Sequence, residues 1–165
     1  DALLEYGLTP AVHSLDQIRQ VERLARSSGK PLRYHLKTDS GMGRLGTRAG
    51  AAEILATLGE TRQAQLEGLM THFASAADYT STQTADQLAY FHKICGELRD
   101  GGVTVQRWHT SSTNAIGYGR TPVSRGDEIR LASPCNIWAT TADDVRRLAG
   151  VKAGSKVTVR REPTG

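Results

Sequence analysis

Residues 35–46 constrain the fold of this chain more than any other stretch. They read HLKTDSGMGRLG, so that an apolar strand leads directly into a loop with three glycines in six residues. Glycine permits positive φ and lets backbone or ligand approach closely. Polar residues at the carboxyl end of a strand, followed by a loop and a helix, are typical of a β/α barrel. The segment therefore predicts a functional edge on a barrel-like sheet.

Strand and helix signals alternate along the first 110 residues. Ser14, with Gln17 three residues later, forms a capping box at the start of a helix that Gly29 ends. The predicted strands are 10–13, 32–37, 66–73 and 103–109. A second helix is predicted over 49–58. A third is predicted to begin at Thr84, with Gln87 completing its start, and to end at Gly101. This order predicts an α/β fold, namely half of a TIM-type β/α barrel with parallel strands.

The length restricts the architecture and suggests an assembly. A chain of 165 residues suits one domain and falls short of the ~250 residues of a whole β/α barrel. We expect a half barrel over 1–130 and a divergent tail over 131–165. A half barrel leaves two open sheet edges, which favour pairing with a second copy. The expected assembly is a homodimer, and the alternative is an open α/β sandwich with covered edges.

The composition restricts the partners. The net charge is +4, and Lys and Arg are scattered apart from the pair Arg160 and Arg161, so no nucleic-acid partner is expected. No apolar run is long enough to cross a bilayer, so no membrane partner is expected either. The cysteines Cys95 and Cys135 lack metal-site spacing, which favours a reducing, cytoplasmic location.

Four segments of the chain resemble the alanine racemase family. Residues 35–46 are similar to the family's HLKxDTGMGRLG, and residues 68–74, GLMTHFA, are similar to its GLxTHFA. Residues 109–115, HTSSTNA, resemble HxANSAA, with Ser112 in place of the Asn and Thr113 in place of the phosphate-binding Ser. Residues 127–130 resemble the start of DxVRPGIALYG. The likeness covers about residues 8–130.

This resemblance implies the N-terminal barrel of an enzyme that uses pyridoxal phosphate (PLP). It implies that Lys37 points inward, is often carbamylated, and holds an active-site arginine that matches Arg44. The implied cofactor-binding residues are Ser112, Thr113, Arg130 and His109. No segment matches the family's PLP-lysine motif KANAYGHG, and the opposing catalytic tyrosine belongs to a domain that is not matched. A racemase needs a Schiff-base amine and a proton donor or acceptor on each face. We therefore expect no racemisation by this chain alone and no PLP.

The residues themselves suggest a metal site instead. His35, Lys37 and Asp39 alternate onto one face of a strand, and His72 and His109 are expected to end the next two strands in the same register. Three imidazoles can hold zinc with an open catalytic position. His35, His72 and His109 are thus the candidate ligands of a divalent metal, with zinc expected. Lys37, Asp39, Arg44 and His72 are the candidate catalytic residues of a hydrolase acting on an anionic ester or phosphoester.

Other interpretations stay open from the sequence alone. The histidines can be hydrogen-bonded core residues, and the chain can be a racemase module (an isomerase) or a folded fragment without activity. Cys135, His109 and Asp127 can form a nucleophilic triad. Residues 111–113 can hold a phosphate or cap a helix. One base added after the Arg130 codon can make the codons of residues 131–135 read Pro-Gly-Ile-Ala-Leu, so we hypothesise a frame change in the tail.

Overall fold

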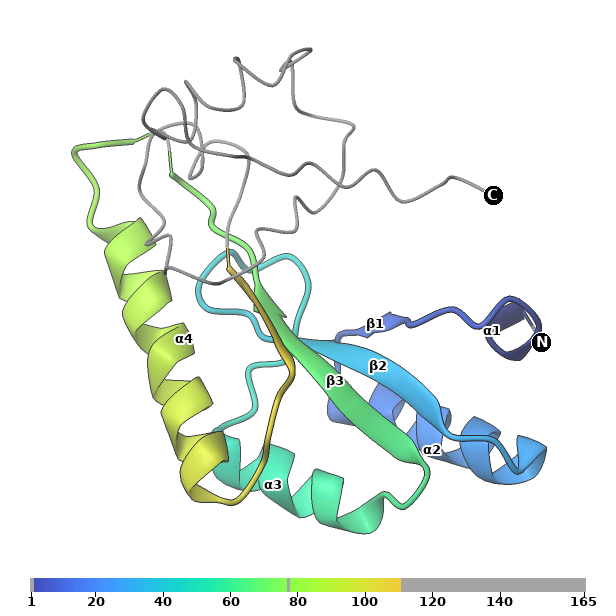
Figure 1. The fold of residues 1–165 in the computed structure, drawn as a ribbon. Helices are drawn as coiled ribbons and strands as arrows, with labels where there is room; N and C mark the ends of the chain where they lie inside the picture. The colour runs from blue at the N-terminus through green and yellow to red at the C-terminus, as the bar shows by residue number, and fades with distance from the viewer. Residues whose placement is uncertain (1, 77, 111–165) are drawn as a thin grey trace, which may run out of the picture.

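The computed structural model of this protein describes residues 2–76 and 78–110 (Figure 1). The helices are α1 (Ala2–Glu5), α2 (Leu15–Ser28), α3 (Ala51–Glu60) and α4 (Gln83–Asp100), and the strands are β1 (Ala11–Val12), β2 (Leu32–Lys37), β3 (Ala64–Thr71) and β4 (Arg107–Thr110). The predictions for residues 111–113, Asp127, Arg130, Cys135 and the 131–165 tail lie outside the described residues.

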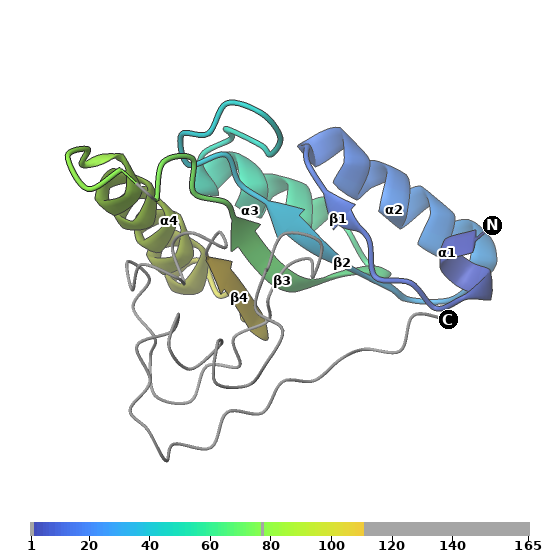
Figure 2. The same cartoon turned by 90° about the horizontal axis from the view of Figure 1, so that it is seen from above.

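The four strands form one parallel sheet in the order β1-β2-β3-β4. Sequential strands joined by right-handed crossovers place every connecting helix on the same side of the sheet. Figure 2 shows α2, α3 and α4 side by side along one face of a curved sheet. This arrangement is that of a barrel wall, and it confirms the predicted partial β/α barrel with parallel strands.

The predicted alternation is confirmed, although element ends shift where local hydrogen bonds decide them. α3 begins at Ala51 because Gly50 is its N-cap, whose N–H donates to Oε2 of Glu53 at 3.0 Å. The capping residue of α4 is Thr82, two residues before the expected start. α1 was not expected from the sequence. No helix in the described part of the chain is both long and apolar enough to cross a membrane.

The predicted cap of α2 is present, with one difference in its partners. The Ser14 hydroxyl accepts from the backbone N–H of Gln17 at 3.2 Å, as a capping box requires. The Gln17 side chain accepts from the N–H of His13, one residue before the cap, rather than from that of Ser14. Gly29 ends the helix in the left-handed region, with φ of 66°.

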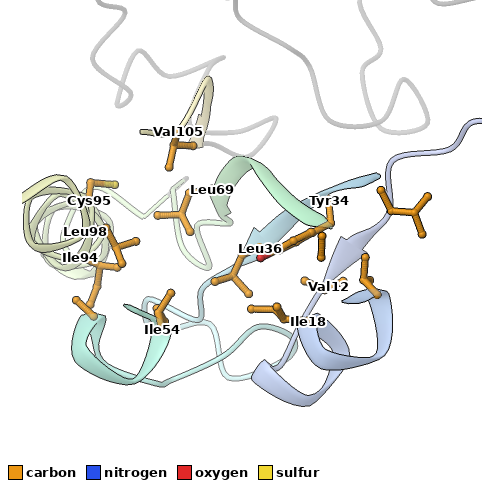
Figure 3. Packing of buried hydrophobic residues seen from close by; sticks show 14 of the residues in the cluster. Val12, Ile18, Tyr34, Leu36, Ile54, Leu69, Ile94, Cys95, Leu98 and Val105 are labelled. Carbon is orange, nitrogen blue, oxygen red and sulfur yellow. The ribbon is translucent and has the colours of Figure 1, made fainter. Parts of the chain in front are cut away.

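The core lies between the sheet and the three long helices. Every second residue of β2 is fully or nearly fully buried on this side, namely Leu32, Tyr34 and Leu36. Figure 3 shows Leu36 and Leu69 of the sheet among Ile18, Ile54, Ile94 and Leu98, which come from α2, α3 and α4. This packing accounts for the apolar stripes of the helices.

The opposite face of the sheet carries the alternate side chains of β2, which are Arg33, His35 and Lys37. Within the described residues no helix covers this face (Figure 2). We call it the bare face. Glu67 of β3 belongs to it, because its carboxylate lies 2.7 Å from Nη1 of Arg107 and 3.9 Å from Nη1 of Arg33. The bare face is therefore charged, whereas the helix-covered face is apolar.

The register between β2 and β3 shifts at one point. Tyr34 pairs with Leu66 and His35 pairs with Gly68, so Glu67 has no partner on β2. Such a bulge adds one residue to one strand and changes which side chains face each other beyond it. A methyl group on Gly68 would lie 2.8 Å from the His35 ring, so the glycine makes room for that imidazole.

Candidate functional site

The glycine-rich loop folds back on the end of β2. The backbone N–H of Thr47 donates to the Lys37 carbonyl at 2.9 Å, and the N–H of Asp39 donates to the Thr47 carbonyl at 2.8 Å. Thr38 N–H donates to the Met70 carbonyl at 2.8 Å, which continues the sheet by one residue. The loop is therefore closed over the carboxyl edge of the sheet, where β/α barrels place their chemistry.

Asp39 holds the loop from inside. Its Oδ1 accepts from the N–H groups of Gly41 at 3.1 Å and Gly43 at 3.0 Å, and its Oδ2 accepts from Nε of Arg48 at 2.9 Å. Burial opposes ionisation, but the hydrogen bonds from Gly43, Arg48 and Gly41 outweigh it and lower the pKa of Asp39 to about 2. Both carboxylate oxygens are thus engaged in the loop. Its predicted catalytic role stays a prediction.

Gly46 is required where the loop returns to the strand. Its φ is +120°, which L side chains rarely adopt, and a Cβ there would lie 2.7 Å from the Asp39 nitrogen and 2.8 Å from the Thr38 carbonyl carbon. The predicted close approach of two backbone segments is therefore observed at this loop. The two segments are the loop itself and the end of the strand that it follows.

Lys37 is the buried cation of this edge. Its residue is 6% exposed, and it lies on the bare face at the end of β2. Burial lowers the pKa of its amine, the charge of Arg44 lowers it further, and Asp39 partly opposes this. Arg44 itself is exposed on the loop. Arg44 and Asp39 are thus near enough to Lys37 to influence its charge, and the catalytic roles proposed for these residues stay predictions.

The three histidines do not share a position along the sheet. His35 pairs with Gly68, whereas Met70 pairs with both Lys37 and His109. His35 therefore lies one row below His109, about 6.6 Å along the strands. His72 follows the end of β3, four residues beyond Gly68, or about 13 Å. The expected common register is wrong, because side-chain alternation fixes the face and not the row.

Within the described residues, no three His, Cys, Asp or Glu side chains are placed so that they could hold a metal ion. The side chain of His109 is not among those described, and only its position in β4 is known. His35 instead packs its ring against Gly68. The carbonyl of His72 accepts from Nε2 of Gln87 at 3.1 Å.

Gln87 is a residue of this edge that sequence reasoning assigned wrongly. It was expected to help open a helix, but it lies in the second turn of α4, is 1% exposed, and points to the loops after β2 and β3. A signal was present: Gln87 stands on the helical stripe of Phe91, Ile94 and Leu98, where a polar residue needs a buried partner.

Comparison with known proteins agrees with this geometry. The family described as "Alanine racemase, N-terminal domain" matches residues 1–131. The alanine racemase of Carboxydothermus hydrogenoformans is 33% identical over 161 residues, which are 97% of this chain and 43% of that protein. The solved alanine racemase of Clostridium difficile 630, in complex with cycloserine, gives a TM-score of 0.64 at 29% identity over 70% of this chain and 32% of that chain.

A more distant structure shares the fold. The alanine racemase from Bartonella henselae with covalently bound pyridoxal phosphate gives a TM-score of 0.58 at 20% identity, over 68% of this chain and 32% of that chain. The present chain therefore spans less than half of the length of each of these racemases.

These findings correct the predicted cofactor. Zinc held by His35, His72 and His109 was expected, whereas the matching proteins are alanine racemases, and the one from Bartonella henselae carries covalently bound pyridoxal phosphate. The prediction of zinc is wrong, and the metal-dependent hydrolase loses its support with it. The exclusion of PLP is also wrong. It depended on one missing lysine motif in a chain that spans less than half of its relatives.

Proposed function

Since the chain belongs to the alanine racemase family, we propose that it is a module of a PLP-dependent amino-acid racemase, with alanine as the expected substrate. The observation that carries this proposal is the buried Lys37 beside Arg44 on a closed glycine-rich loop. The loop stands at the carboxyl edge of the parallel sheet, where a barrel binds its ligands. Because the chain spans less than half of its relatives, the whole reaction is part of the proposal.

The residues at this edge fit an anionic cofactor. PLP carries a phosphate and a phenolic oxygen, and an amino-acid substrate adds a carboxylate. The loop carries two exposed arginines, of which Arg48 is bonded to Asp39, and Arg44 is the one proposed to bind the ligand, since an arginine can donate two parallel hydrogen bonds to such groups. Ser112, Thr113, Arg130 and His109 stay predicted cofactor-binding residues, because their side chains lie outside the described structure.

PLP, when bound, supplies an electron sink that stabilises the charge left after the α-proton of an amino acid is removed. In the proposal Arg44 binds an anionic oxygen and orients the ligand over the sheet edge. The loop held by Asp39 keeps Arg44 in place. Proton transfer on the two faces of the α-carbon is assigned to parts of the racemase fold beyond the matched stretch.

Lys37 is proposed to act through a carbamate. Its lowered pKa increases the fraction of free amine, and the free amine can attack carbon dioxide. The free amine forms a nitrogen–carbon bond while one C=O π bond of carbon dioxide opens, and one proton then leaves to solvent. Because the ammonium has already lost one proton to become the free amine, the side chain changes from a cation into an anion with two protons released in total. Arg44, which disfavours the charged ammonium of Lys37, would then face an opposite charge. Carbamylation would thereby turn a repulsion into an ion pair that fixes the arginine.

A binding experiment tests the proposal. Pyridoxamine 5′-phosphate is the probe, because it lacks the aldehyde that would react with surface lysines. We expect saturable binding that shifts the amide resonances of Gly41 and Gly43 in ¹H–¹⁵N spectra. Arg44→Gln should weaken binding about tenfold, which is near the contribution of one hydrogen bond to a charged group. The control, Arg62→Gln, removes an exposed arginine between α3 and β3, at the opposite edge.

The outcomes separate the possibilities. Absence of saturable binding, or equal weakening by both variants, would contradict an anion site at this edge. With PLP and L-alanine added, formation of D-alanine would assign the whole reaction to this chain. Binding without formation of D-alanine would restrict the chain to a binding module. A cytoplasmic location and the lack of nucleic-acid and membrane partners stay predictions.

A further inference from the structure

The side chain of Gln87 connects three segments at the carboxyl edge of the sheet. Its Oε1 accepts from the N–H of Ala74 at 3.0 Å, and its Nε2 donates to the His72 carbonyl at 3.1 Å and to Oγ of Ser40 at 3.2 Å. Ser40 belongs to the loop after β2, and the other two follow β3. One buried carboxamide on α4 therefore joins both loops.

The network continues from Ser40 with a fixed direction. Ser40 Oγ lies 2.6 Å from Oγ1 of Thr71, and Thr71 donates to the Thr38 carbonyl at 3.1 Å. Because Gln87 donates to Ser40 and the Thr38 carbonyl can only accept, Ser40 must donate to Thr71. The amide is also oriented, since the Ala74 N–H can only donate and the His72 carbonyl can only accept. Each hydrogen bond from Gln87 through Ser40 and Thr71 to Thr38 therefore has one possible donor and one possible acceptor.

We propose that Gln87 is a positioning residue whose carboxamide locks the loops after β2 and β3 together, and so holds the loop of Arg44 and the backbone of His72 in place at the sheet edge where Lys37 ends β2. The inference rests on the proposed function in one respect only, that this edge binds the ligand. The loop that carries Ser40 also carries Arg44, and Asp39 makes it a single unit. Gln87 is thereby a buried link between α4 and the unit that presents the arginine, and Gln83 of α4 adds a longer, exposed contact, from its Nε2 to the Gly41 carbonyl at 3.4 Å.

Glutamine is the residue that this place requires. Glutamate would place a carboxylate oxygen against the His72 carbonyl, although both groups can only accept, or it would leave Ser40 without the hydrogen bond that Gln87 donates. Methionine has a similar size but leaves the Ala74 N–H and the His72 carbonyl without the partner that Gln87 provides. The position of Gly41 shows how close α4 lies to the loop after β2, since a Cβ on Gly41 would be 3.4 Å from Cγ of Gln87.

The test measures local changes in the two loops and not only the overall stability of the protein. In Gln87→Met and Gln87→Glu we expect the amides of Ala74 and Gly43 to exchange with solvent about tenfold faster or more, because local opening becomes easier. The pKa of Lys37, followed by NMR, should rise toward its ordinary value as Arg44 moves away and burial decreases. Both measurements are made on the whole chain without PLP, so failure of the proposed function leaves them unaffected.

Two further variants keep the result decisive. Thr57→Val removes a buried hydroxyl that donates to the Glu53 carbonyl within α3 and accepts from Nη2 of Arg19, and it should lower stability without changing the Lys37 pKa or exchange at Gly43. Ser40→Ala breaks the series from the loop side and should shift Lys37 in the same direction as the Gln87 variants. If the Gln87 variants do not fold, Ser40→Ala decides. An unchanged Lys37 pKa in all folded variants, or an equal change in Thr57→Val, would overturn the proposal.

Discussion

Asp39 shows at the scale of one residue how a buried carboxylate can make a glycine-rich loop rigid. Three donors, from Gly41, Gly43 and Arg48, converge on its two oxygens, and they favour the ionised form strongly enough to overcome burial. The charge of Asp39 is thus used to shape the loop that presents Arg44. Arg48 is largely exposed, so the two glycine N–H groups define the fixed part of this arrangement.

The lowered pKa of Asp39 predicts how stability depends on pH. The folded pKa is about 2, below the ordinary value of 3.8, so the unfolded chain binds this proton at higher pH. The stabilisation is therefore complete above about pH 5 and is lost as pH falls from about 4 toward 2. Asp39→Asn should cost about 2 kcal/mol at pH 7 and flatten this part of the pH profile, as measured by urea unfolding.

Glu22 has a pKa lowered to about 2 as well and serves as the internal reference for that experiment. The Asp39→Asn variant should keep the part of the acid-induced loss that belongs to Glu22. A variant with the full wild-type slope between pH 4 and 2 would show that Asp39 is not ionised in the way described.

At the scale of elements, Glu22 joins α2 to the start of β3. Its Oε2 accepts from the N–H groups of Gln63 and Ala64 at 2.9 and 2.7 Å, and its Oε1 accepts from Nε of Arg26 at 2.6 Å. Glu22→Gln should lower the free energy of unfolding by about 2 kcal/mol, since hydrogen bonds to charged groups are lost at a buried site. Chemical denaturation at pH 7 measures this difference.

A matched control lies on the same helix. Asp16 pairs with Arg19 on the surface, so Asp16→Asn should change stability by less than about 0.5 kcal/mol. Equal effects of the two substitutions would mean that Glu22 does not connect α2 to the sheet.

The elements could be predicted from the sequence because periodicity and caps are local properties. Ser14, Gly29 and the apolar stripe of α4 lie where their spacing indicates. The register between strands depends on the bulge at Glu67, and no local pattern marks it. The face of His35 follows from alternation along the strand, but its row does not: Met70 pairs with both Lys37 and His109, and His35 stands two residues before that row. Gln87 was missed for a related reason, since its partners lie in two loops distant in sequence.

At the scale of the whole molecule, the charge of the bare face restricts how two copies can meet. Among the described residues of this face, the side chains of Arg33 and Arg107 are exposed, whereas Lys37 and the carboxylate of Glu67 are buried. Two copies joined face to face would bring like charges together, which is unfavourable in a closed interface. Joining through sheet edges avoids this, because backbone groups form the contact.

We therefore predict a homodimer formed through sheet edges rather than through the bare face. Light scattering at high micromolar concentration should give twice the 17.9 kDa mass of the chain. The interface should bury more than ~1,000 Å² in total. Between about 0.05 and 0.5 M salt the dimer should change little, because backbone hydrogen bonds are screened less than facing charges.

Arg33→Gln should leave the dimer intact. A dimer that tightens with added salt or with Arg33→Gln would instead indicate face-to-face pairing. A monomer at these concentrations would contradict the assembly altogether.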